Sequence, residues 1–258
     1  MITTEQLKAL REETGISVMQ CKKALEEAGG DMEKARVILK KKSGDVAAKK
    51  LDRTLGAGTI VTAQNDNRAV ILALLCETDF VAKNSDFVEA AKSLADKALN
   101  EGKDAVESAS AEMTNSLVQK VGENIKIGNI IIVDSDKAGV YNHNGMFASV
   151  VVLKEKNAEL AKDLAMHATA MRPTYLSESD IPETDRNNAK DILGKEVAEQ
   201  AADKPEEMKA KILEGKINAY FKEQILLNQS FIKDPNKSIT QLLKEANNEI
   251  VSFQIEQI

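Results

Sequence analysis

The chain has 258 residues, enough for one large domain or for two to three small ones with a substantial core. Hydrophobic residues make up 43% and charged residues 29%, and the formal net charge of −6 argues against a general binder of nucleic-acid phosphates. No apolar run approaches the ~20 residues of a membrane span, and the first residues show neither a signal peptide nor a transit segment. We therefore expect a cytoplasmic protein that contacts neither membrane nor nucleic acid directly.

The sequence contains no recognisable catalytic motif or metal-ligand cluster. Its two cysteines, Cys21 and Cys76, lie far apart in apolar contexts and are predicted to be buried free thiols. Its two histidines, His143 and His167, have no Cys/His cluster beside them, and no phosphate-binding glycine loop, dinucleotide fingerprint or nucleophile elbow occurs. We therefore predict a protein that is not an enzyme and holds no metal and no cofactor. On the residues alone, His143 is interpreted as an ordinary hairpin histidine and His167 as structural.

Residues 1–43 are predicted to form a three-helix docking module. The helices begin at polar N-caps, Thr3, Ser17 and Asp31, and glycines end the first two. The lysines at 40–42 are placed at the C-terminal end of the third helix, where positive charge is favourable. The pattern resembles a ubiquitin-associated-type module, a superfold that suggests a protein-docking surface and nothing narrower.

Residues 44–57 are predicted to be a linker. Between Ser43 and Arg53 the chain is polar, rich in lysine and short of large apolar residues. We interpret these lysines as part of a solvated tether rather than as a nucleic-acid site.

Residues 58–136 are predicted to be the first half of an α+β core. Strands at 59–63 and 68–76 flank a hairpin turn at Asn65–Asn67, and an amphipathic helix follows from Ser85 to about Asn100. A further helix and strand complete this half, at about 111–121 and 125–133.

Residues 137–182 are predicted to be the second half of the core. Strands at 138–143 and 146–153 meet at Asn144–Gly145, a strong type I′ turn signal, and a helix from about 158 to 171 stops before Pro173. This order of hairpin and helix repeats that of the first half. The sequence therefore predicts a duplicated α+β core with antiparallel sheets.

Residues 183–227 are predicted to be an antiparallel helical hairpin, an inserted coiled-coil-like arm. Its composition is rich in Ala, Lys and Glu, and Asp203–Pro205 breaks it into two helices. The arm is either a partner contact or a structural spur. Residues 228–258 are predicted to hold a short helix capped by Ser238 and a terminal strand that returns to the core sheet.

The corner between the strand 68–76 and the helix at Ser85 has an unusual composition. A simple turn is expected to use Gly, Pro, Asn or Ser, whereas this corner offers Asp79, Phe80 and Val81. Phe80 either folds back as a lid on its own core or projects as an anchor into another protein, with Asp79 orienting the loop. Spacing alone does not choose between these two interpretations.

Several stretches of the chain resemble the elongation factor Ts family, the nucleotide exchange factors of the translational GTPase elongation factor Tu. The resemblance extends over essentially the full length. The stretches that carry it are Thr78-Asp79-Phe80-Val81-Ala82-Lys83-Asn84, the run from Thr14 to Leu25, Lys120–Ile125, Met166–Ala168 leading to Arg172–Pro173, and Phe231–Pro235.

The resemblance implies a partner and a set of contact residues. The partner is elongation factor Tu. A homodimer and a 2:2 complex with this partner are both left open. A wedge is implied to enter between two helices of the GTP-binding domain, near its magnesium and phosphate site, and to promote GDP release so that GTP rebinds. The implied wedge residues are Thr78, Asp79, Phe80 and Val81, and the other implied contact residues are Arg11, Val18, Met19 and His143.

The sequence departs from the family pattern in two places. Gly128–Asn129 replaces a basic pair that many relatives carry, so no partner contact is assigned there. The longer C-terminal extension of some members is also missing from this sequence, and its contacts are not carried over.

Two other functional classes are alternatives on the residues alone. One is a translation-associated adaptor or holdase without exchange activity, with Phe80 in the core. The other is a hydrolase that uses acidic pairs, which have no sequence signature.

Overall fold

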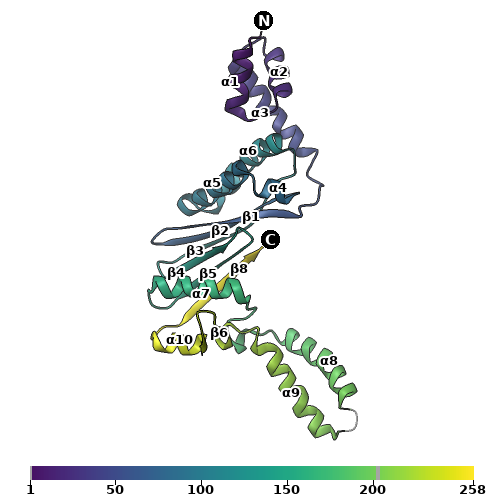
Figure 1. The fold of residues 1–258 in the computed structure, drawn as a ribbon, viewed down its shortest axis with the longest axis vertical. Coiled ribbons are helices and arrows are strands. Elements are labelled where there is room, and N and C mark those ends of the chain that lie inside the picture. Colours follow the sequence, from purple (N-terminus) through teal and green to yellow (C-terminus); the bar gives the residue numbers. More distant parts are fainter. Residues whose placement is uncertain (1, 202–203) are drawn as a thin grey trace. The chain divides into compact units, whose positions relative to one another are not determined.

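The computed structural model describes residues 2–201 and 204–258 (Figure 1). The chain divides into two compact units. The first unit extends to Asp134 and includes Asn142–Ala148 and Glu256–Ile258, and the second contains Ser135–Tyr141 and Ser149–Ile255. Helices and antiparallel sheets are both present, so the predicted α+β class is confirmed. Within the described residues, no helix combines the length and apolarity needed to cross a bilayer.

The first unit begins with a bundle of the helices α1 (Thr4–Thr14), α2 (Val18–Glu27) and α3 (Met32–Ala48) (Figure 1). The predicted caps are present, including a capping box in which Thr3 and Gln6 satisfy each other's backbone amides. The small core of the bundle is formed by Leu10, Ile16, Cys21, Ala24, Leu25, Ala35 and Leu39. Cys21 is a buried free thiol, as predicted.

The third helix is longer than predicted. Its end was expected at lysines 40–42, with a linker from residue 44, but α3 continues to Ala48. The reason is that Ser43 and Ala47 extend its buried face, and Ala47 joins the core of the following region through packing on α6. The sequence predicts a polar tether here because the buried face of this last part of the helix carries small side chains, Ser43 and Ala47.

The next part of the first unit is a three-stranded antiparallel sheet with two helices. The strands β1 (Ala57–Gln64), β2 (Arg68–Cys76) and β3 (Lys126–Asp134) lie in the order β1-β2-β3. Helix α5 (Ser85–Glu101) packs on β1 and β2, and α6 (Lys103–Val121) packs on α5 and α3. The structure thus extends α6 eight residues before the predicted start at 111, because Val106 is fully buried and adds another turn to its core face.

The departure at Gly128–Asn129 is a β-bulge. Leu72 pairs with Ile130 and Leu74 with Ile127, so these two residues of β3 lie opposite Ala73 alone. A Cβ on Gly128 would lie 3.2 Å from that of Ala73, which favours glycine here. Asn129 donates to a carboxylate oxygen of Glu256 at 2.8 Å.

The second sheet repeats the organisation of the first. The strands β4 (Ala138–His143), β5 (Phe147–Leu153) and β8 (Ile250–Gln257) lie in the order β4-β5-β8, so the second strand of a hairpin is again central. Both turn residues have positive φ, 55° at Asn144 and 71° at Gly145, as a type I′ turn requires. Helix α7 (Ala158–Met171) shares a core cluster with β5, and the terminal strand returns to the sheet as predicted.

The helical arm lies between α7 and β8 in the sequence. Its helices α8 (Glu183–Gln200) and α9 (Glu206–Lys222) pack on each other, and Ile181, Ala189, Phe221 and Ile225 form a small core at its base. The predicted break at Asp203–Pro205 includes Asp203, which lies outside the described residues. The other elements near the arm in the sequence are the 3₁₀ turns Glu178–Asp180 and Leu226–Asn228, the strands β6 (Ser230–Phe231) and β7 (Asp234–Ser238), and the helix α10 (Ile239–Glu245), which Ser238 caps.

Candidate functional site

The corner after β2 contains a single helical turn, α4 (Asp79–Ala82). Thr78 is its N-cap, and the Thr78 hydroxyl accepts a hydrogen bond from the backbone N–H of Val81 at 3.4 Å. Asn84 caps the next helix by accepting from the backbone N–H groups of Asp86 and Phe87 at 2.9 and 3.4 Å. The corner therefore passes from strand to helix through two successive caps.

Phe80 projects from this corner into solvent. Its side chain is 83% exposed, although Val81 and Ala82 on the same turn pack against the core of the first unit. The lid interpretation of Phe80 is therefore wrong. A large exposed aromatic side chain on a fixed backbone is typical of a residue that is buried in a complex.

Asp79 is exposed beside Phe80 and forms an ion pair with Lys83 one turn later, at 2.8 Å between the carboxylate and Nζ. The hydrogen bond and charge of Lys83 lower the pKa of Asp79. Asp79 is therefore ionised at neutral pH, and the tip of the corner carries a charged pair around an apolar side chain.

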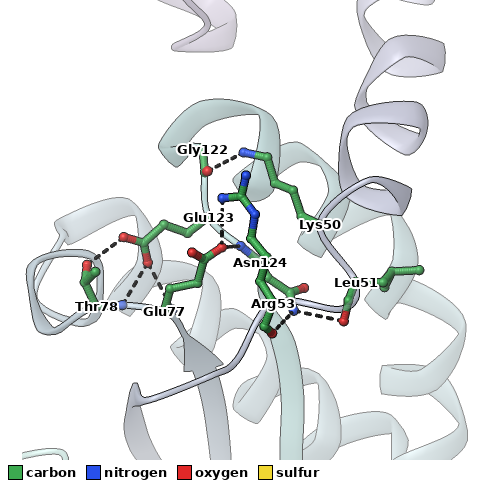
Figure 2. A network of polar contacts seen from close by, with 8 residues as sticks. All are labelled: Lys50, Leu51, Arg53, Glu77, Thr78, Gly122, Glu123 and Asn124. Atoms are coloured by element: carbon green, nitrogen blue, oxygen red, sulfur yellow. Dashed lines mark hydrogen bonds and ion pairs between the residues drawn. The ribbon is translucent and has the colours of Figure 1, made fainter.

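Glu123 holds the start of the corner from a distant part of the chain (Figure 2). One oxygen of its carboxylate accepts from the backbone N–H groups of Glu77 and Thr78, each at 3.0 Å. The other accepts from the Thr78 hydroxyl at 2.6 Å. Three donors from two adjacent residues thus converge on one side chain.

Glu77 makes the reciprocal contact. Its carboxylate accepts from the backbone N–H of Asn124 at 2.6 Å and lies 3.4 Å from a guanidinium nitrogen of Arg53. The Asn124 hydrogen bond, with a smaller contribution from Arg53, lowers the pKa of Glu77. The segments around residues 77 and 123 are therefore joined in both directions.

The same network includes residues 50–53, the segment that follows α3 (Figure 2). The buried amide of Asn124 donates to the carbonyl oxygens of Leu51 and Arg53, at 3.3 and 3.0 Å. The ammonium group of Lys50 donates to the carbonyl of Gly122. The predicted tether is thus fixed to the β2 corner by hydrogen bonds.

Sequence reasoning assigned no role to Glu77 or Glu123. A signal was present, because Glu123 follows the glycine that ends α6 and falls inside one of the family-like stretches, Lys120–Ile125. Contacts between residues 45 or more positions apart are not visible in local spacing.

Cys76 lies directly behind the corner as a buried free thiol, as predicted. Its sulfur lies 3.2 Å from the carbonyl oxygen of Thr78, to which it donates. Burial raises the pKa of Cys76 to about 11, so the thiol stays protonated and is a poor nucleophile at neutral pH. It therefore adds packing rather than reactivity to the corner.

The three sequence-predicted docking residues of the N-terminal bundle lie at one end of it. Arg11 is in the last turn of α1, and Val18 and Met19 are in the first turn of α2. All three side chains are exposed, and Met19 is not part of the bundle's core. Apolar side chains at this end are therefore available to a partner.

The two histidines differ in their surroundings. His143 is exposed at the end of β4, in a hairpin tip held against β1 by the bond from the backbone N–H of Ile60 to the carbonyl of Gly145 at 2.6 Å. His167 is fully buried and lies 3.0 Å from the side-chain oxygen of Gln229, as expected of a structural residue. Burial lowers the pKa of His167. No group of three or more potential metal-ligating side chains occurs in the part of the chain that the structure describes.

Comparison with known proteins establishes the family. The family model of Elongation factor TS matches residues 77–258, a range that includes the corner. Elongation factor Ts of Alcanivorax borkumensis is 39% identical over 261 residues, which cover 96% of this chain and 91% of that protein. The chain belongs to the elongation factor Ts family. Elongation factor Ts of Hahella chejuensis is 38% identical and that of Acholeplasma laidlawii 36%, each over 98% of this chain and 90% of the relative.

The resemblance seen in the sequence is therefore confirmed. Elongation factor Ts proteins are exchange factors of elongation factor Tu in translation elongation and are not enzymes. The N-terminal helices lie outside the residues that the family model matches, but the elongation factor Ts relatives cover nearly the whole chain.

Proposed function

We propose that the chain binds elongation factor Tu·GDP and promotes GDP release by inserting the Thr78–Val81 corner near the magnesium and phosphate site, after which GTP binds. The observation that carries this proposal is the 83% exposure of Phe80 on a turn whose other apolar residues are packed. An exposed aromatic side chain on a backbone fixed by caps and by Glu123 loses little conformational freedom when it binds.

The energy required is modest. A thousandfold acceleration of GDP release needs a barrier lower by ~4 kcal/mol. Burial of one Phe side chain supplies ~2–3 kcal/mol, and contacts elsewhere supply the rest. GDP and the factor favour different conformations of the partner, so each weakens the binding of the other by the same factor. No covalent chemistry is required.

Arg11, Val18, Met19 and His143 are proposed as further contacts with the partner. The first three occupy one end of the N-terminal bundle, and His143 lies at the tip of the β4–β5 hairpin, which is bonded to β1. All four are exposed. They lie apart from Phe80 in the chain, so they are suited to hold the partner while the corner acts on the nucleotide site.

The test is the release of a fluorescent GDP analogue from purified elongation factor Tu. Strong acceleration by the wild-type chain and only a weak residual acceleration by Phe80→Ala are expected. Val251→Ala is the matched control, because Val251 is 60% exposed and lies on β8, away from the corner in the sequence. If folded Phe80→Ala accelerates release normally, the wedge mechanism is refuted. If the wild-type chain binds a cognate partner without accelerating release, the adaptor function is supported instead.

A further inference from the structure

A carboxylate outside the corner determines how the corner is held. We propose that Glu123 is a positioning residue for exchange, one that fixes the direction of Phe80 through the backbone of Glu77 and Thr78. This inference rests on the proposed function of Phe80.

The turn α4 cannot fix its own direction. It has only four residues, and a single helical turn is not stable alone. Its one side-chain cap, from Val81 to Thr78, is long at 3.4 Å. Phe80 is 83% exposed and therefore adds little packing. The direction of its side chain therefore depends on what holds the residues on either side.

Val81, Ala82 and the cap at Asn84 hold the C-terminal side of the turn, and Glu123 holds the N-terminal side. Two contacts at one carboxylate oxygen and one at the other fix both the position and the rotation of Thr78. The Thr78 hydroxyl donates its only proton to Glu123, which leaves its lone pairs free to accept from Val81. Glu123 thus also orients the cap of α4.

Glu123 is itself firmly placed. Gly122 before it ends α6 with a φ of 79°, and its carbonyl accepts from Lys50. Asn124 after it is 2% exposed and is bonded through its backbone to Glu77 and through its side chain to Leu51 and Arg53. The carboxylate therefore projects from a backbone that is restrained on both sides (Figure 2).

The chemistry of the contact requires a carboxylate of this length. Backbone N–H groups and a hydroxyl are three donors, and an ionised carboxylate is a side chain that only accepts. The two backbone amides and the hydroxyl meet its charge at hydrogen-bond distance, and the Lys50 ammonium adds a coulombic attraction. An aspartate at this position would keep the charge but would hold it one methylene group farther from the three donors.

The experiment measures the rate of fluorescent GDP release from elongation factor Tu against the concentration of the full-length factor, for wild type, Glu123→Ala, Phe80→Ala and the double variant. Glu89→Ala is the control, because Glu89 is an exposed carboxylate on α5. A misplaced Phe80 is expected to lower the rate at saturation by about ten- to a hundredfold. The half-saturating concentration should change far less, because the other proposed contacts are untouched. General loss of folded protein would instead raise the half-saturating concentration and leave the saturating rate unchanged.

The double variant decides whether Glu123 acts through Phe80. The inference expects little further loss when Glu123→Ala is added to Phe80→Ala. An equal loss in both backgrounds, or a normal saturating rate of Glu123→Ala, would overturn it. If Glu123→Ala does not fold, Glu123→Asp takes its place with the same outcomes. A normal rate for Phe80→Ala refutes the wedge itself, whereas a defective Phe80→Ala beside a normal Glu123→Ala refutes only the role of Glu123.

Discussion

Replacement of Met19 by alanine tests whether the N-terminal bundle and the corner have separate kinetic roles. Met19 is 69% exposed in the first turn of α2. Full burial of a Met side chain is worth about 1.5–3 kcal/mol, so the exposed part represents about 1–2 kcal/mol of binding free energy. This corresponds to an increase of about 5- to 30-fold in the half-saturating concentration of the factor.

The saturating rate of GDP release should not change in Met19→Ala. The reason is that a docking contact is made equally before and during nucleotide release, so it contributes uniform binding. The assay is again fluorescent GDP release from elongation factor Tu over a range of factor concentrations. Val37→Ala is a close control, since Val37 is 68% exposed on α3 of the same bundle and is not a proposed contact. A lower saturating rate for Met19→Ala, or equal effects of the two variants, would refute the reasoning.

Three further predictions concern stability. Phe87→Ala removes a fully buried side chain and should lower the free energy of unfolding by about 3–5 kcal/mol in urea titrations, whereas Phe80→Ala should change it by less than about 0.5 kcal/mol. Burial lowers the pKa of His167 in the folded state, so the unfolded state binds the proton more readily. The stability of the fold should therefore decrease as the pH drops below the pKa of the unfolded state, about 6.5. His167→Gln should remove this part of the pH dependence in thermal melts. Gly139→Ala should destabilise the fold by about 1–3 kcal/mol, because a Cβ there would lie 2.3 Å from the backbone of α7. Gly215→Ala should instead stabilise α9 by about 0.5–1 kcal/mol, because nothing lies within 4 Å of its added Cβ. Equal melting temperatures of these two variants would contradict both expectations.

Much of the secondary structure could be predicted from the sequence, because its boundaries have local signals. The strand β2 is predicted with its observed bounds from a continuous apolar run, and the end of α7 from Pro173. The turn at Asn144–Gly145 was predicted from its two residues alone. In each case the information lies within a few neighbouring residues.

The parts that were not predicted depend on distant residues. The last turns of α3 are helical because Ala47 packs on α6, a partner far along the chain. The exposure of Phe80 could not be read from spacing, since a side chain beside a strand end has room to turn either way. The roles of Glu77 and Glu123 also depend on which segments the fold brings together.

The base of the helical arm has a consequence for how the chain tolerates change. The backbone N–H of Thr174 bonds to the carbonyl of Gln224 at 2.9 Å, and that of Leu226 to the carbonyl of Tyr175 at 2.8 Å. The arm thus begins and ends at adjacent points of the backbone, where Tyr175 and Ile225 form a β-bridge. Because the cost of closing a loop grows slowly with its length, the segment beyond this bridge can be shortened, extended or exchanged for another hairpin with little penalty to the strands on either side. The arm is therefore a natural site for length variation and for grafting a reporter domain.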